Sequence, residues 1–140
     1  MYIDSNIFIY ATLDTEKLGK QCRTIIEAIN QQSITCASSY LVIDEVLWIL
    51  KKHIGRADAA TIIKSMLSLP IKWIDVNDAV ILHLLSLFEQ TTLDPRDTLH
   101  LASMKENALF TIISEDTDFD KIKGIKRMSA AQLIKQHLNE

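Results

Sequence analysis

The chain has 140 residues, of which 48% are hydrophobic and 24% charged, and this length suits one domain with its own core, which we expect to span residues 1–140. Gly and Pro are scarce, which argues against linkers and low-complexity tails. The net charge of −3 does not exclude a nucleic-acid binder, because a metal ion that neutralised a cluster of carboxylates would leave the remaining surface slightly basic.

Short apolar runs alternate with amphipathic segments, which is the pattern of a βα repeat. The segment 16–32 is typical of a helix, since its apolar residues recur on one face. Ser38 or Ser39 can cap the helix that follows the second strand. The first half of the chain is predicted to contain strands at 1–3 ("MYI") and 33–37 ("SITCA"), and helices at 7–11, 16–32 and about 40–53.

The second half continues the alternation, and Pro70 ends its first helix. It is predicted to contain a helix at 57–69, a strand at 71–76, a helix at 79–90, a helix opened by Asp97, a strand at 110–114, an acidic loop at 115–120, a strand near 125–128 and a helix from Ser129. The strands are short and separated by helices. We therefore expect an α/β protein with a three-layer α/β/α arrangement and a central, mainly parallel sheet.

The compartment is indicated by the cysteines and by the apolar segments. Cys22 and Cys36 form no CxxC motif, and we expect free thiols in a reducing cytoplasm. The longest apolar stretch, "AVILHLLSLF", is too short to span a bilayer, and the first residues are strand-like rather than a secretory signal. A cytoplasmic protein without a membrane contact is the expectation.

Two carboxylates lie at positions where an ionised carboxylate needs a partner. Asp4 follows the first predicted strand, and ligands collect at the carboxyl ends of strands in parallel sheets. Asp4 could instead be only the N-cap of the next helix. Glu45 lies in "YLVIDEVLWIL", which is apolar on nearly every side, so a buried Glu45 would need a partner such as a cation. The alternative is a solvated helix face that carries both Asp44 and Glu45.

The segment "DPRDTLHLASM" holds two further acids at a helix start. Asp94 and Pro95 already supply the signal that begins the helix, which leaves Asp97 available for another role. His100 lies three residues after Asp97 on the same face. A lone histidine beside apolar residues is more often packed in a core than catalytic, so we interpret His100 as a core residue and leave a functional role open.

A late loop, "SEDTDFD", places Asp116, Asp118 and Asp120 close together. An EF-hand is excluded, because its sixth and twelfth positions hold Lys121 and Arg127 instead of Gly and Glu. Together with the acids after the first strand, inside the mid-chain helix and at the late helix start, this loop completes an oxygen-only set of candidate ligands. Such a set suits Mg²⁺ or Mn²⁺ better than zinc.

In chain order, "YIDSNIFIY", the Glu of "LVIDEVLWIL", "RDTLHLASM" and "TIISEDTDFDKIKGIKRM" resemble the motifs of the PIN-domain family, and within it the VapC-like toxins of type II toxin–antitoxin systems. The matching segments extend from residue 2 to about residue 128. The chain departs from the usual pattern at Thr98, where an alanine commonly follows the third acid.

The resemblance implies a metal-dependent endoribonuclease that hydrolyses RNA phosphodiester bonds and uses Mg²⁺ or Mn²⁺. Asp4, Asp97 and Asp116 would hold the metal, and Glu45 would complete the four catalytic acids of the family. By the same resemblance, Asn6 and Ser114 would support these acids, and Asp118 could stand in place of Asp116. We further expect the pKa values of the acids to be coupled, and in part raised, when no metal is bound.

RNA phosphates would need cations near the acids. Arg96, beside Asp97, is the strongest candidate, and each of the others could be an ordinary solvated residue. The other candidates are Lys51, Lys52 and Arg56 after the Glu45 helix, and Lys121, Lys123, Lys126 and Arg127 after the acidic loop. If several of them contact phosphates, RNA affinity should fall steeply with salt.

Other classes of acid-bearing α/β proteins fit the sequence less well. A phosphatase of the haloacid-dehalogenase type needs a second Asp where the chain has Asn6, and a D-x-S-x-S adhesion module is excluded by Asn6 and Phe8. A receiver domain could use Asp75, but no acidic pair near the first strand accompanies it. The alternative that stays open is a catalytically inactive PIN-like binding or scaffold module.

A VapC-like toxin would also have protein partners. The resemblance implies a cognate antitoxin that covers the pocket with a helix or an extended tail, and a homodimer. Leu18 and Ile25 on the early helices could belong either to the core or to the dimer face. The RNA target and the number of metal ions stay open.

Overall fold

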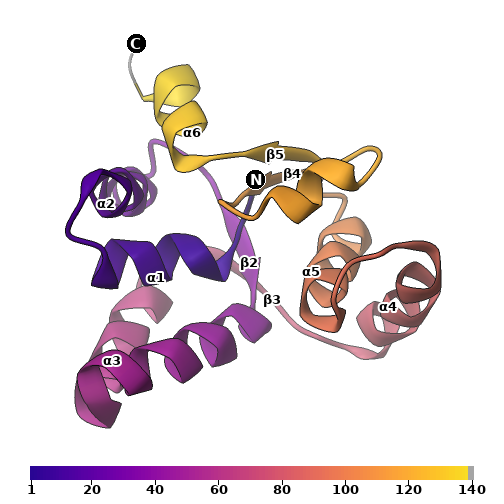
Figure 1. Ribbon diagram of the computed structural model, residues 1–140, viewed down its shortest axis with the longest axis horizontal. Coiled ribbons are helices and arrows are strands. Elements are labelled where there is room, and N and C mark those ends of the chain that lie inside the picture. The colour runs from indigo at the N-terminus through magenta and orange to yellow at the C-terminus, as the bar shows by residue number, and fades with distance from the viewer. Residues whose placement is uncertain (139–140) are drawn as a thin grey trace.

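The computed structural model describes residues 1–138, in which a five-stranded parallel sheet lies between two layers of helices (Figure 1). The strands are β1 (Tyr2–Ile3), β2 (Ala37–Ser39), β3 (Lys72–Ile74), β4 (Thr111–Ile113) and β5 (Lys126–Met128). The helices are α1 (Ser5–Leu13), α2 (Lys17–Asn30), α3 (Tyr40–Leu67), α4 (Asp78–Gln90), α5 (Pro95–Glu106), the short 3₁₀ helix η1 (Thr117–Lys121) and α6 (Ala130–His137). The predicted three-layer α/β/α fold is confirmed.

The two faces of the sheet carry separate hydrophobic cores. Ile3 and Ile113 lie in the core that includes residues of α1, α2, α3 and α6. Their strand neighbours Tyr2 and Ile112 lie in the core formed with α4 and α5. All four side chains are fully buried, because successive residues of a strand point to opposite faces and both faces of this sheet are covered.

The strand order β3-β2-β1-β4-β5 positions the candidate site. The chain leaves β1 toward β2 and β3 on one side and returns to β4 and β5 on the other, so the connections diverge between β1 and β4. Asp4 follows β1 directly and Ser114 follows β4 directly. In open α/β sheets, ligands bind at the carboxyl ends of the strands at such a switch point.

The second strand was predicted too early. It was expected at 33–37, but β2 comprises Ala37–Ser39. Ser38 and Ser39, one of which was expected to cap the next helix, are both strand residues. Ser39 does occupy the N-cap position of α3, but its side chain makes no capping hydrogen bond, and the Ser38 hydroxyl donates to the carbonyl of Ile3 at 2.8 Å. The strand boundary was predicted wrongly because a buried serine hydroxyl can be satisfied by a neighbouring strand as well as by a helix terminus.

The predicted helices at 40–53 and 57–69 form one kinked element, α3. Gly55, with φ +83° and ψ 171°, interrupts the helical backbone between them. These dihedral angles lie in a region that is essentially restricted to glycine. The predicted break therefore exists, and α3 changes direction there instead of ending.

Other expectations concern the two ends of the fold and its core. Ser129 caps α6 through a complete capping box with Gln132, which agrees with the helix predicted from Ser129.

Within residues 1–138, Cys22 and Cys36 form no disulfide, and burial raises the pKa of their thiols to about 12 and about 11. Ile25 is a fully buried core residue and so offers no dimer face. Over the same residues, none of the helices has the length and apolarity needed to cross a bilayer.

Candidate functional site

Asp4 lies at the centre of a hydrogen-bond network at the carboxyl ends of β1 and β4. The residue is 5% exposed, and one carboxylate oxygen accepts from the Ser114 hydroxyl at 2.6 Å and from Asn6 Nδ2 at 2.8 Å. The other oxygen accepts from the backbone N–H of Ser5 at 2.7 Å, so Asp4 also serves as the N-cap of α1. The two alternatives considered for Asp4 are thus compatible, because capping occupies only part of its hydrogen-bonding capacity.

Ser114 links this network to the late acidic loop. Its hydroxyl donates to Asp4 and accepts from Asn6 Nδ2 at 2.9 Å and from the backbone N–H of Asp116 at 3.0 Å. The two residues that the resemblance assigned to supporting roles, Asn6 and Ser114, therefore join Asp4 to the loop that carries Asp116.

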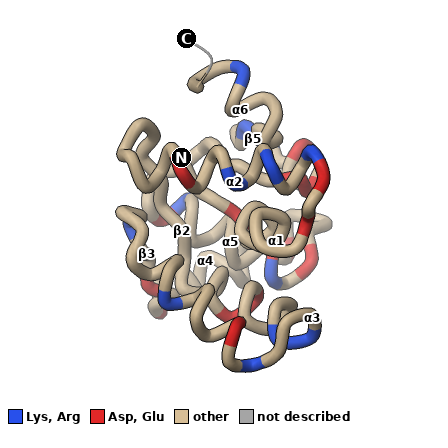
Figure 2. The backbone as a smooth tube through the Cα atoms, turned by 90° about the vertical axis from the view of Figure 1, so that its left-hand side faces the viewer, with Lys and Arg blue, Asp and Glu red and all other residues tan. Residues whose placement is uncertain are grey.

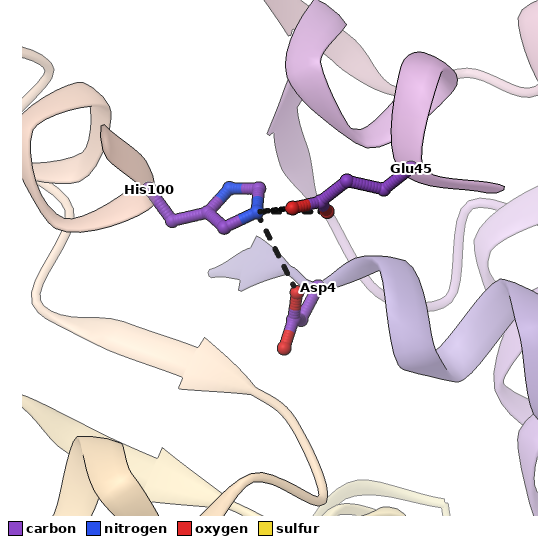
Figure 3. A group of neighbouring side chains, drawn as sticks. All are labelled: Asp4, Glu45 and His100. Carbon is purple, nitrogen blue, oxygen red and sulfur yellow. Dashed lines mark hydrogen bonds and ion pairs between the residues drawn. The ribbon is translucent and has the colours of Figure 1, made fainter. Parts of the chain in front are cut away.

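Glu45 reaches the same region from the first turns of α3, where its residue is 9% exposed (Figure 3). Its carboxylate lies 2.9 and 3.1 Å from His100 Nε2, and His100 Nε2 is 3.9 Å from Asp4 Oδ1. The solvated-face alternative for Glu45 is wrong. The partner in contact with the buried carboxylate is an imidazole from α5.

His100 is 1% exposed and contacts polar groups through both ring nitrogens. Nδ1 lies 2.6 Å from the Tyr2 hydroxyl, which donates to Ser39 Oγ at 2.9 Å. Because the Tyr2 proton is directed to Ser39 and a carboxylate faces Nε2, both imidazole nitrogens are in position to donate, as in the imidazolium form. His100 is thus a core residue, as interpreted from the sequence, and also a member of the acidic cluster.

The pKa values of this pair move in the directions that an ion pair requires. Desolvation opposes the charge on Glu45, but the hydrogen bond and charge of His100, with smaller contributions from Ser5 and Arg96, lower its pKa. Desolvation likewise opposes the charge on His100, but Tyr2, Glu45 and Asp4 raise its pKa well above the ordinary value. Glu45 is therefore ionised at neutral pH, and it is not among the acids whose pKa values are raised.

Asp97 lies in the first turn of α5, which begins at Pro95 after Asp94 rather than at Asp97. Asp97, Asp116 and Asp118 each offer an oxygen, and these oxygens lie within 4.8 Å of one another. Asp118 pairs with Lys121 at 2.7 Å and is half exposed. Asp116 accepts from the Asp118 backbone N–H at 2.9 Å, and its own N–H is tied to Ser114. Asp116 is less exposed than Asp118, whose carboxylate is already paired with a lysine.

The acids at this edge act on one another electrostatically. Desolvation, followed by the charges of Asp116 and Asp4, raises the pKa of Asp97 to about 6. Desolvation also raises the pKa of Asp4, although His100 and Ser114 partly offset it. The ligand atoms that lie within 4.8 Å of one another belong to two groups, Asp4 with Glu45 and His100, and Asp97 with Asp116 and Asp118, so Asp4 is not in the same group as Asp97 and Asp116. A cation beside Asp97 and Asp116 would relieve the repulsion, and carboxylate oxygens suit a hard divalent ion such as Mg²⁺ or Mn²⁺.

The cationic candidates differ in their surroundings. Arg96 is exposed beside Asp97, and Lys51, Lys52 and Arg56 lie along α3 beyond Glu45, where Figure 2 shows acidic and basic segments close together. Arg127 does not extend toward a substrate, because it binds Asp120 at 2.9 Å and the carbonyl of Ser114.

Two more of the cations predicted after the acidic loop are also poorly placed. Lys121 is held by Asp118 at 2.7 Å. Lys126 is the first residue of β5 and so lies at the amino ends of the parallel strands, whereas the acids lie at their carboxyl ends. The α3 cations, Arg96 and the exposed Lys123 remain the candidates for contact with a polyanion.

Sequence reasoning missed Tyr2 and Ser39 as members of the site. Both are strand residues that belong to no catalytic sequence motif, and only the pairing of β1 with β2 brings their hydroxyl groups together. A signal was available for His100, which follows Asp97 by three residues and thus shares its helix face.

The PIN domain family matches residues 1–125, and the chain belongs to this family. None of the curated proteins matches the sequence. The acids described above lie within the matched residues.

Solved structures share the fold at low sequence identity. A toxin–antitoxin complex from Klebsiella pneumoniae is similar with a TM-score of 0.64 and 21% identity, over 89% of this chain and 93% of the other. VapBC2 from Rickettsia felis, bound to a DNA fragment from its promoter, is similar with a TM-score of 0.70 and 16% identity, over 91% of this chain and 96% of the other. VapC20 from Mycobacterium tuberculosis, a sarcin-ricin loop cleaving toxin, is similar with a TM-score of 0.69 and 13% identity, over 85% of this chain and 92% of the other. The fold is therefore that of VapC toxins.

Proposed function

We propose that this protein is a VapC-like, metal-dependent endoribonuclease that hydrolyses RNA phosphodiester bonds at a site formed by Asp4, Glu45, Asp97 and Asp116. The observation that carries the proposal is that, after desolvation, the charges of Asp116, Asp4 and Glu45, which come from three other segments, all raise the pKa of Asp97. The acids lie in two groups near the switch point between β1 and β4, Asp4 with Glu45 and His100, and Asp97 with Asp116 and Asp118. Membership of the PIN domain family and a fold shared with VapC20, a sarcin-ricin loop cleaving toxin, support it.

Asp4, Asp97 and Asp116 are the residues that would hold Mg²⁺ or Mn²⁺. When bound, the ion supplies a nucleophilic water at neutral pH and offsets charge that develops on the phosphate. Asn6 and Ser114 hold the Asp4 carboxylate in one orientation before any ligand arrives, because both donate to the same oxygen. Such preorganisation limits the conformational cost of binding the ion.

Glu45 would orient the attacking water or accept its proton. It is suited to this task because it is ionised at neutral pH and His100 restrains its position. Arg96 would neutralise a phosphate oxygen of the RNA, since it is exposed next to the acids. Lys51, Lys52 and Arg56 would contact phosphates further along the strand.

The proposal includes protein partners. The Klebsiella and Rickettsia structures are a toxin–antitoxin complex and a VapBC complex, which supports a cognate antitoxin for this chain. We also propose a homodimer, because α4 exposes Leu82, Leu85 and Phe88 by 68%, 57% and 48%. With RNA as substrate and an antitoxin as partner, the protein would act in the cytoplasm.

The first test is a thermal-shift titration with Mn²⁺ and Mg²⁺ on wild type, Asp4→Asn, Asp97→Asn and the control Asp58→Asn, which removes an exposed acid from the second half of α3. Wild type and the control should be stabilised saturably, by about 2.7 kcal/mol at a hundred times Kd, and the two site variants should not. Metal-dependent cleavage of total RNA by wild type, and not by Asp97→Asn, completes the test. Metal binding without cleavage of any RNA would favour the binding-module alternative, and no metal response at all would remove the nuclease mechanism.

A further inference from the structure

We propose that Trp48 and the basic residues around it form a subsite that stacks an unpaired RNA base beside the acids. The inference rests on the nuclease function proposed above and deepens it, because it assigns single-stranded RNA as the form of substrate and α3 as the element that selects it.

Trp48 is in an unusual environment for a tryptophan. Its side chain lies on α3 and is 47% exposed, whereas Trp73 is half-buried and stacks on Tyr40. Trp48 follows Glu45 by three residues, which corresponds to about 4.5 Å along the helix axis. A large aromatic surface is therefore presented to solvent within one helical turn of a candidate catalytic acid.

A hollow of about 410 Å³ lies against this ring. It is lined by Asp44, Leu47, Trp48, Lys51, Arg56 and Ala60. Leu47 and Trp48 provide apolar surface, and Lys51 and Arg56 provide positive charge at its rim. Asp44 is the only acid among these lining residues. A nucleotide has the complementary chemistry, because its base has an apolar face and its phosphate is anionic.

The lysines already lie where a nucleotide would be bound. Lys51 Nζ is 3.9 Å and Lys52 Nζ is 4.5 Å from the centre of the Trp48 ring. A cation–π contact at an exposed site is weak, so an arriving base can displace the ammonium groups from the ring face. The displaced ammonium groups can then pair with the flanking phosphates, as in proteins that bind single strands by stacking within a basic groove.

This charge pattern favours RNA over a protein helix as the occupant. Lys51, Lys52 and Arg56 bring three positive charges around one exposed ring, against the single negative charge of Asp44. A duplex would keep its bases stacked on one another and could not present a face to Trp48. The subsite therefore selects an unpaired base next to the bond to be cleaved.

The test measures RNA binding in EDTA, where no cleavage can occur, with a short fluorescein-labelled oligouridylate and an abasic oligomer of the same length and charge. Fluorescence anisotropy is recorded for wild type, Trp48→Ala, Trp48→Phe and the control Phe110→Ala. Phe110 is 54% exposed but directly precedes β4, so it lies at the amino ends of the strands, away from the acids at their carboxyl ends. Unlabelled oligouridylate is titrated in parallel while tryptophan fluorescence is recorded.

Trp48→Ala should bind oligouridylate about tenfold more weakly than wild type, Trp48→Phe should lie between them, and Phe110→Ala should equal wild type. The abasic oligomer should bind all four proteins equally and weakly. Oligouridylate should quench tryptophan fluorescence in wild type but not in Trp48→Phe, a readout that holds even if the alanine variant folds poorly. Equal affinity of wild type and Trp48→Ala, or equal binding of the abasic oligomer and oligouridylate by wild type, would overturn the subsite.

The two proposals can fail separately. A protein that cleaves RNA with metal but shows no base-dependent binding through Trp48 keeps the nuclease function and loses the subsite. A protein that binds oligouridylate through Trp48 but never cleaves RNA keeps a single-strand site and loses the nuclease. A loss of antitoxin binding in Trp48→Ala with unchanged RNA binding would assign the surface to the protein partner and overturn the RNA subsite.

Discussion

At the scale of single residues, Glu45 retains its charge in the interior because the imidazole of His100 replaces water as its partner. The distances of 2.9 and 3.1 Å from Nε2 to the two carboxylate oxygens describe a well-formed pair. A second pair of the same residue types, His83 and Glu106, lies at 2.7 Å on the surface, where both side chains are about one-third exposed. The two pairs allow the effect of burial to be measured within one protein.

His100→Ala should lower the free energy of unfolding by about 3 kcal/mol, because it leaves a buried carboxylate without its partner. His83→Ala should cost no more than about 1 kcal/mol, since an exposed pair contributes little. Urea denaturation at pH 7 measures both values. In the Glu45→Gln background the loss caused by His100→Ala should be smaller. Equal losses for the two histidines would contradict a buried ion pair.

The pKa of Asp97 predicts how the metal-free protein responds to pH. The folded pKa of about 6 lies above the ordinary value of 3.8, so the folded state favours the protonated acid. Asp97 therefore destabilises the fold as pH rises from about 4 through 6, and the full penalty remains at higher pH. In EDTA, Asp97→Asn should be more stable than wild type by about 1–2 kcal/mol at pH 7.5, after allowance for solvent screening, and similar to it at pH 4. Thermal unfolding across this pH range is the measurement, and a less stable variant at pH 7.5 would refute the repulsion.

At the scale of secondary structure elements, α3 changes direction at Gly55, and only its first half carries an acid of the candidate site. Val42, Val46 and Leu50 of that half are buried in the core as well. Glu45 and Trp48 precede Gly55, whereas Ile63 and Met66 follow it and are buried in the core with α1 and α2. The turn requires φ +83° at Gly55, and a Cβ added there would meet no atom within 4 Å. Any cost of a substitution therefore arises from the backbone conformation and not from a clash.

Gly55→Ala should destabilise the protein by about 1–3 kcal/mol, because alanine is strained in this backbone region. Ser65→Ala, at an exposed position of the same helix, should change stability by less than about 0.5 kcal/mol. Chemical denaturation followed by circular dichroism gives both values. A gain in helicity with unchanged stability would show instead that α3 can straighten.

At the scale of the whole molecule, α4 is the least covered element of the second helical layer. Its inner face packs on α5 through Val80 and Leu87, while Leu82, Leu85 and Phe88 stay exposed. An apolar stripe of this kind is typical of an interface between subunits. The homodimer proposed above therefore makes a specific prediction about this helix.

Leu85→Lys should convert a dimer to a monomer in sedimentation velocity, since burial of an unpaired lysine in an apolar interface is costly. Leu67→Lys, at an apolar position that is 45% exposed at the end of α3, should leave the dimer intact. A wild-type protein that is monomeric at all concentrations, or a dimer that tolerates Leu85→Lys, would exclude α4 as the interface.

The assignment of residues 1–140 to one domain stays a prediction.

Patterns along the chain were sufficient to predict most of the architecture. The alternation of short apolar runs with amphipathic segments indicated the parallel sheet and its two helical layers, because both features reflect local periodicity and burial. Boundaries such as β2 were wrong where a polar residue had two ways to be satisfied. Asp4 and Glu45 could be singled out because each stood in a place that is costly for a charge, and Asp97 because Asp94 and Pro95 already began its helix. The choice of Asp116 within the acidic loop depended on the family motifs.

What the sequence by itself determined was the set of elements, their α/β class and the acidic residues at their ends, since these depend on residues close together in the chain. Only the tertiary structure decided which side chains meet. Tyr2, Ser39, Glu45 and His100 come from four different elements, and their hydrogen bonds exist because β1 lies beside β2 and both are covered by α3 and α5. Contacts between residues far apart in sequence depend on how the layers are packed, and no local pattern encodes them.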